Sequence, residues 1–161
     1  MRNSIWKQFG ASIDMLENAI NFCPAEHWNT DKKIWYNAYH CLFYLDYYLT
    51  MDPGTFSPPA PFGLSEFEED EMPGSVYSKE ELLVYLQYCR NKCESVIFSL
   101  TDQNLNDDWT NVSGTMKFTV LGILLYNMRH VQHHAAQINL LLRQSIDDAP
   151  GWVREAGDSL L

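Results

Sequence analysis

Four stretches of the chain repeat apolar residues at intervals of three and four, which is the period of an amphipathic helix. They cover residues 4–22, the aromatic-rich residues 31–50, residues 78–100 and residues 115–145. A Ser-x-x-Glu capping box marks the start of the third stretch. No stretch alternates polar and apolar residues convincingly enough to predict a strand. The sequence therefore predicts an all-α chain, arranged most economically as a four-helix bundle.

Residues 51–77, between the second and third predicted helices, differ in composition from the rest of the chain. They contain five of the seven prolines and six acidic residues, and they lack lysine and arginine. A connection this long is usually a lid, a binding loop or a disordered insert, and it also permits a crossover between helices. Its three phenylalanines favour a loop that packs on the helices, whereas the acidic run at residues 66–71 is expected to face solvent. These phenylalanines are Phe56, Phe62 and Phe67.

The other connections complete a single expected domain over residues 1–161. Residues 101–113 are rich in Asp and Asn and read as a polar loop. Residues 146–161 read as a C-terminal tail, in which Trp152 and Val153 are candidates to pin the chain back onto the helices. A chain of 161 residues has the usual size of one domain and can build a core without disulfides or metals.

The net charge and the cysteines of the chain restrict its possible binding partners and its cellular compartment. Eleven basic and 21 acidic residues give a formal net charge of −10, which repels phosphate backbones, so no nucleic-acid partner is expected. The N-terminus lacks the apolar core of a signal peptide, and no apolar run approaches the roughly 18 residues of a membrane span. The cysteines lie in apolar stretches without the spacing of a disulfide framework, which predicts small buried thiols in a cytoplasmic protein. They are Cys23, Cys41, Cys89 and Cys93.

Three of the five histidines lie within residues 130–134 of the fourth predicted helix. His130 and His134 are four residues apart, so their Cβ atoms are about 6 Å apart on one face and both imidazoles can reach one metal ion. At about 100° per residue, this pair lies beside the apolar stripe and His133 points toward solvent. His40, in the middle of the second helix, is the candidate third ligand. Three neutral imidazoles with one open position suit catalytic zinc, and also nickel or iron.

The same histidines also have a simpler interpretation. A single histidine in an aromatic helix usually packs without binding metal, so the pattern alone supports a metal site and ordinary packing about equally. Stronger metal motifs are missing, because Val131 occupies the place of the glutamate in His-Glu-x-x-His, and no glutamate stands three residues before a histidine. The sequence also lacks a P-loop, a Gly-x-Gly-x-x-Gly turn and a Gly-x-Ser-x-Gly elbow.

Four polar side chains of the second helix have two interpretations each. Tyr36, Tyr44 and Tyr47 are candidates to line a cleft and hydrogen-bond a substrate, although core packing explains them equally well. Asp46 is most simply a solvated acid, and alternatively a group that orients a tyrosine or a ligand.

Two segments resemble the sequence of one known family. The first is the aromatic helix with a central histidine at residues 34–43, IWYNAYHCLF. The second is the fourth helix, which reads His130-x-x-x-His134-x-x-Gln137-Ile138. On the basis of these two segments, the chain resembles the DinB/YfiT-like family of proposed metalloenzymes. The resemblance covers nearly the whole chain. The resemblance implies a four-helix bundle with a crossover topology, a three-histidine metal site and a homodimer.

Carried onto this chain, the resemblance assigns His40, His130 and His134 as metal ligands. It places Gln137 one turn beyond His134, as a candidate to support a ligand or to line the pocket. Similar members include transferases and isomerases that use a low-molecular-weight thiol, which the metal activates as a thiolate. The chain is therefore expected to be a divalent-metal-dependent enzyme, a thiol S-transferase or a hydrolase, acting on a small molecule. The alternative is a non-catalytic dimeric binding or scaffold protein whose metal is structural or absent. The loop at residues 51–77 is longer than a minimal member needs and would narrow the pocket.

Overall fold

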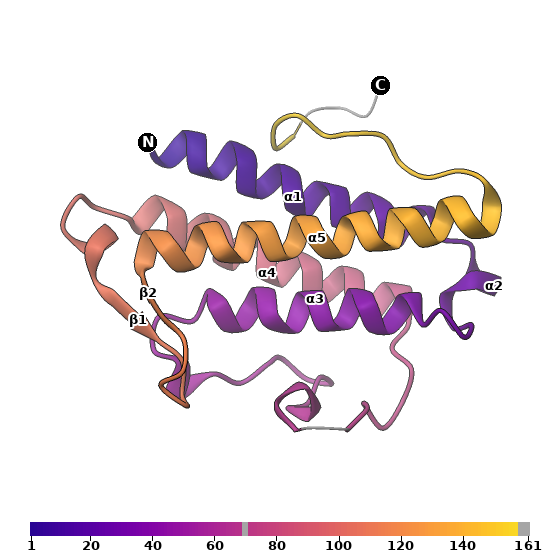
Figure 1. Cartoon of the computed structure of the whole chain (residues 1–161), viewed down its shortest axis with the longest axis horizontal. Coiled ribbons are helices and arrows are strands. Elements are labelled where there is room, and N and C mark those ends of the chain that lie inside the picture. The colour runs from indigo at the N-terminus through magenta and orange to yellow at the C-terminus, as the bar shows by residue number, and fades with distance from the viewer. Residues whose placement is uncertain (69–70, 158–161) are drawn as a thin grey trace.

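The computed structural model describes residues 1–68 and 71–157, and within them the chain is mainly helical. A small antiparallel sheet precedes the last helix (Figure 1). The expectation of a mainly helical chain is confirmed, whereas the expectation of no strand is wrong. The helices are α1 (Arg2–Phe22), α2 (Ala25–Trp28), α3 (Ile34–Tyr48), α4 (Lys79–Ser99) and α5 (Val120–Ile146), and the strands are β1 (Asp108–Thr110) and β2 (Lys117–Thr119).

Local backbone features explain where α3 and α4 begin. The Ser78 hydroxyl accepts from the N–H of Glu81 at 3.1 Å, and the Glu81 carboxylate accepts from the N–H of Ser78 at 2.7 Å. This is the capping box that the sequence predicted for α4. Helix α3 begins at Ile34, later than predicted, because Lys33 has a left-handed φ of 47°, which does not fit within a right-handed helix.

The β-hairpin occupies a segment that the sequence suggested to be a loop and the start of a helix. Trp109 of β1 lies opposite Phe118 of β2. Trp109 is buried, and its indole N–H donates to the carbonyl of Thr50 at 2.9 Å, which fixes the hairpin to the end of α3. Helix α5 begins only at Val120, because the preceding residues pair in the sheet and the Thr119 side chain caps the first turn.

The long helices pack side by side around an apolar core. Helix α5 contacts both α1 and α3, and α4 contacts the same two helices (Figure 1). Leu16, Leu42, Leu86 and Ile138, one from each long helix, are fully buried. None of the described helices has the length and apolar character needed to cross a membrane. The packing places the middle of α3 against the middle of α5.

The connection between α3 and α4 packs along α3, as its phenylalanines predicted. The rings of Phe56 and Phe67 lie 5.2 Å and 5.0 Å from the ring of Phe43 on α3. Phe62 stacks on Tyr85 of α4, with ring centroids 4.4 Å apart. Aromatic contacts of all three phenylalanines therefore hold this connection on the helices.

The acidic run at residues 66–71 was expected to face solvent, and for Glu66 this is wrong. The Glu66 side chain is only 2% exposed, because its carboxylate is hydrogen-bonded to a histidine of α3. Glu68 and Glu71 are exposed, as expected. Residues 69–70 lie outside the described residues.

The C-terminal tail packs on α1 through Val153 and the residues that follow it. Val153 is buried, as expected, whereas Trp152 is 69% exposed and does not pin the tail. The N–H of Ala156 donates to the carbonyl of Lys7 at 2.8 Å. A Cβ atom on Gly10 would lie 2.6 Å from the Cβ of Ala156, so the absence of a side chain on Gly10 permits this close approach.

A buried polar cluster joins α3 to α4. Asp46 is fully buried, so its interpretation as a solvated acid is wrong. Its carboxylate accepts hydrogen bonds from Lys92 Nζ at 2.6 Å and from the hydroxyl of Tyr85 at 3.0 Å. Lys92 Nζ also donates to the hydroxyl of Thr50 at 2.7 Å. Asp46 thus orients a tyrosine, the alternative that the sequence left open, and it also carries an ion pair.

Candidate metal centre

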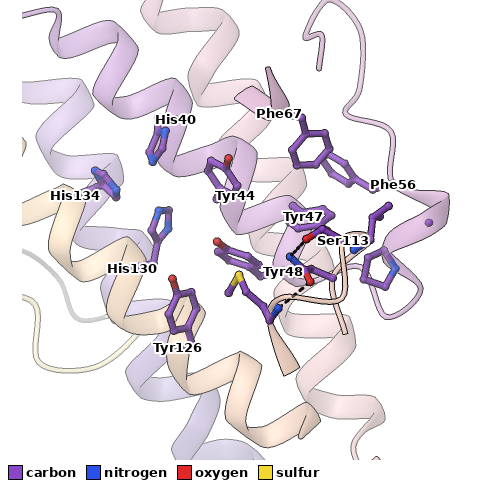
Figure 2. A pocket seen from close by; sticks show the side chains of 15 residues that line it. His40, Tyr44, Tyr47, Tyr48, Phe56, Phe67, Ser113, Tyr126, His130 and His134 are labelled. Carbon is purple, nitrogen blue, oxygen red and sulfur yellow. Dashed lines mark hydrogen bonds between the residues drawn. The ribbon is translucent and has the colours of Figure 1, made fainter. Parts of the chain in front are cut away.

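Three histidines meet where α3 packs against α5 (Figure 2). His40 comes from α3, and His130 and His134 come from successive turns of α5. Each offers one nitrogen, and the three nitrogens lie within 4.8 Å of one another. His133 is exposed and outside this group, as the helical period predicted. The structure therefore brings the three predicted histidines into a cluster compatible with one bound metal ion.

Glu66 holds the imidazole of His40. Its Oε2 lies 2.6 Å from His40 Nδ1, and its side chain is 2% exposed. A carboxylate can only accept a hydrogen bond, so Nδ1 carries the proton and Nε2 is left as the nitrogen able to bind a metal. A carboxylate in this position is a common partner of a metal-binding histidine and increases its basicity.

Asn37 and Gln137 hold the imidazole of His134. His134 Nδ1 lies 2.9 Å from Asn37 Oδ1, and Asn37 Nδ2 donates to Gln137 Oε1 at 3.4 Å. When Asn37 accepts through Oδ1, the proton of His134 sits on Nδ1 and Nε2 is again left free. Gln137 thus supports Asn37, and its side chain also interacts with His134 itself.

His130 has no such partner among residues 1–68 and 71–157. Its Nδ1 is buried and forms no hydrogen bond there, and Glu66 Oε1 is in the same state. Burial, and then the neighbouring histidines, lower the pKa of His130 to about 3 and that of His134 to about 4. Both imidazoles are therefore neutral at neutral pH, the form that binds a metal ion. A cation among these groups would satisfy the unpartnered nitrogen and balance the buried carboxylate, so the donor set fits a divalent ion.

The lowered histidine pKa values predict how the metal-free protein responds to acid. In the unfolded chain these groups have a pKa of about 6.5, so between pH 6.5 and 4 the unfolded state binds more protons than the folded state. Stability is then present above pH 6.5 and is lost as the pH falls. We expect chelator-treated protein to be less stable to urea at pH 5 than at pH 7, with a smaller difference in His130→Gln. An equal pH dependence in both proteins would contradict this assignment.

A pocket of about 740 Å³ opens beside the three histidines (Figure 2). Its walls come from α3, α5, the connection after α3 and the turn of the β-hairpin. Among residues 1–68 and 71–157, no lysine, arginine, aspartate or glutamate side chain is part of these walls. The pocket therefore suits a small molecule with a substantial apolar or aromatic part. Its aromatic lining residues are Tyr44, Tyr47, Tyr48, Phe56, Phe67 and Tyr126.

The structure places the three tyrosines that the sequence grouped as cleft residues in two neighbouring pockets, both of which Tyr44 lines. Tyr44 and Tyr47 line the large pocket beside the histidines. Tyr36 lines a smaller neighbouring pocket with Glu66, and burial, followed by the charge of that glutamate, raises the pKa of Tyr36 to about 12.

Sequence reasoning missed Glu66 and Asn37, which contact the imidazoles of His40 and His134. Glu66 was hidden in an acidic run, and only the path of the connection over α3 brings it inside. Asn37 stands three residues before His40, on the same helix face. That spacing could have indicated from sequence that Asn37 faces the histidine cluster.

Comparison with known proteins gives one family for this chain. A family model described as the DinB superfamily matches residues 8–138. The chain belongs to the DinB superfamily. The matched DinB region includes all three clustered histidines and both connections that wall the pocket. No curated protein and no solved structure matched the chain.

Proposed function

We propose that this DinB-superfamily protein is a divalent-metal-dependent enzyme with His40, His130 and His134 as the metal ligands. The observation that carries the proposal is the position of the three clustered nitrogens, within 4.8 Å of one another at the edge of a 740 Å³ pocket. Three protein ligands leave one position open, which distinguishes a catalytic site from a closed structural site. Zinc, nickel and iron all suit three imidazoles.

The residues around the cluster prepare it for chemistry on a small molecule. When bound, a divalent ion lowers the pKa of a water or thiol that it coordinates and so supplies a nucleophile at neutral pH. Glu66 and Asn37 hold two imidazoles in the required tautomer. The aromatic walls, including Tyr44 and Tyr47, would contact the apolar part of a substrate.

The protein's own cysteines support an external thiol as the nucleophile. All four are buried and unbridged. Burial raises the pKa of the Cys41, Cys89 and Cys93 thiols, so these side chains stay protonated and unreactive. We therefore favour transfer from a low-molecular-weight thiol, with hydrolysis as the second reaction. Buried unbridged thiols also support a cytoplasmic protein.

Three features of the overall architecture belong to the same proposal. The four long helices would form the crossover bundle of the DinB/YfiT-like topology, residues 1–161 would act as one domain, and the protein would work as a homodimer. The contacts of α5 and α4 with both α1 and α3 support the bundle.

The proposal is tested by the metal content of protein purified without chelators. We expect about one equivalent of zinc, nickel or iron in the wild type, by inductively coupled plasma mass spectrometry, and almost none in His130→Ala. His133→Ala is the matched control, since His133 is exposed on the same helix outside the cluster, and it should keep the ion. Equal metal content in the wild type and His130→Ala would contradict the three-histidine site.

The metal-loaded protein then separates an enzyme from a scaffold. In protein loaded with cobalt, a thiol that binds the open position produces a sulfur-to-metal charge-transfer band. We expect this band with a low-molecular-weight thiol and thiol consumption when an electrophile is added. A loaded protein that binds neither thiol nor substrate would support the non-catalytic alternative.

A further inference from the structure

We propose that Glu66 is a positioning residue that couples metal binding at His40 to the placement of residues 51–68, the connection that forms one wall of the pocket. The inference rests on the proposed metal site and extends it. It assigns a role in metal binding to a side chain outside the long helices, and it makes the metal centre and the pocket wall depend on each other.

The first support is the environment of the Glu66 carboxylate. The side chain is 2% exposed, and its Oε2 lies 2.6 Å from His40 Nδ1. Its other oxygen, Oε1, is buried without a hydrogen-bond partner in the described part of the chain. A buried carboxylate is costly unless it is paired with a positive charge. Within residues 1–68 and 71–157, the ion pair to Glu66 comes from His40 alone. A metal ion on the far side of that imidazole would supply the positive charge that Glu66 requires.

The second support is the effect of Glu66 on the tautomer of His40. Because the carboxylate accepts from Nδ1–H, Nε2 presents a lone pair toward the cluster. A glutamine at the same place carries no charge and can also donate to Nδ1, which would favour the tautomer protonated at Nε2. That tautomer cannot bind a metal through Nε2, so the charged form of the side chain matters as well as its size.

The third support is the position of Glu66 in the connection. Its backbone carbonyl accepts from the hydroxyl of Tyr44 at 2.8 Å. The next residue, Phe67, packs 5.0 Å from Tyr47 and 5.8 Å from Phe56, measured between ring centroids. These aromatic residues line the pocket. Fixing Glu66 on His40 therefore fixes the wall that Phe56 and Phe67 provide.

Reciprocity follows from these contacts. If a metal on His40 strengthens the bond to Glu66 and so orders residues 51–68, an ordered connection must strengthen metal binding by the same factor. The metal centre and the pocket wall should therefore form together.

The first test is the metal affinity of Glu66→Gln, measured by zinc competition with a chromophoric chelator. We expect binding about 10- to 100-fold weaker than in the wild type, the usual effect of removing such a partner. Glu68→Gln, two residues away on the same connection and exposed, is the matched control and should bind zinc as the wild type does. Wild-type affinity in a folded Glu66→Gln protein would overturn the inference. Failure of the wild type itself to bind metal would instead overturn the proposed function.

The second test is hydrogen exchange of residues 51–68 with and without zinc. In the wild type, zinc should slow exchange in this segment, and in Glu66→Gln at saturating zinc the slowing should be largely lost. Equal protection by zinc in both proteins would overturn the coupling, because the segment would then respond to metal without Glu66.

Tyr44→Phe gives an independent test that leaves the carboxylate in place. It removes the hydroxyl that holds the Glu66 carbonyl and keeps the bond between Glu66 and His40. If the connection and the metal centre are coupled, zinc binding should weaken several-fold and exchange in residues 51–68 should rise. Unchanged affinity in Tyr44→Phe would overturn the coupling even if Glu66→Gln failed to fold.

Discussion

Replacing Lys92 with methionine is expected to lower the free energy of unfolding by about 3–5 kcal/mol. The substitution keeps most of the side-chain volume and removes the charge that faces Asp46 at 2.6 Å. Asp46 is fully buried, and it would retain only the hydroxyl of Tyr85 as a side-chain partner among those that the structure describes. The measurement is urea unfolding followed by circular dichroism, with Lys117→Met on the exposed strand β2 as the control.

A double variant separates loss of the ion pair from simple loss of packing. Combining Lys92→Met with Asp46→Asn removes both charges and leaves an oxygen that can still accept from Tyr85. Because the cost of Lys92→Met comes mainly from an unpaired buried charge, the double variant should be more stable than Lys92→Met alone. If the double variant is the less stable protein, the ion pair is not the cause of the loss.

Replacing Trp109 with alanine is expected to destabilise the protein by about 3–5 kcal/mol, the usual cost of removing a large buried aromatic side chain. Trp109 is 1% exposed, and its ring lies 5.9 Å from those of Tyr47 and Tyr48. The substitution also removes the indole donor to the carbonyl of Thr50. Urea unfolding measures the loss, and Trp152→Ala, at an exposed tryptophan, should change stability little.

Trp109→Phe distinguishes the packing of the indole from its hydrogen bond. Phenylalanine retains much of the ring volume but leaves the carbonyl of Thr50 without the indole donor. We therefore expect the free energy of unfolding of Trp109→Phe to lie between those of the wild type and Trp109→Ala. If Trp109→Ala unfolds with wild-type stability, the hairpin does not contribute to the core in the way that its burial indicates.

Much of the histidine cluster could be predicted from sequence, because it depends on helical periodicity. His130 and His134 share a face through their spacing, and His40 lies in the middle of the helix that packs on them. The same period predicted correctly that His133 points away. These predictions needed only the rotation per residue and the knowledge that the two helices meet, which the family resemblance supplied.

The residues around the cluster could not be predicted in this way, because they depend on the path of the chain in space. Glu66 belongs to an acidic run whose composition is typical of a solvated loop, and its burial follows from the packing of neighbouring phenylalanines on α3. Asp46 resembled a surface acid because its partner, Lys92, stands on another helix. The hairpin strands contain three residues each, too few to show a period of two.

Only part of the pocket wall comes from the helices that carry the histidines. The proposed ligands stand on α3 and α5, whereas Phe56, Phe67 and Met116 reach the pocket from the connections. Insertions or substitutions in those connections can reshape the cavity while the helical registers that align the imidazoles stay intact. The connections can therefore vary at the pocket without moving the three histidines, provided that Glu66 stays on His40. A relative with the same helices and a carboxylate in the place of Glu66, but otherwise different connections, would be expected to keep the histidine cluster and to accept a different small molecule.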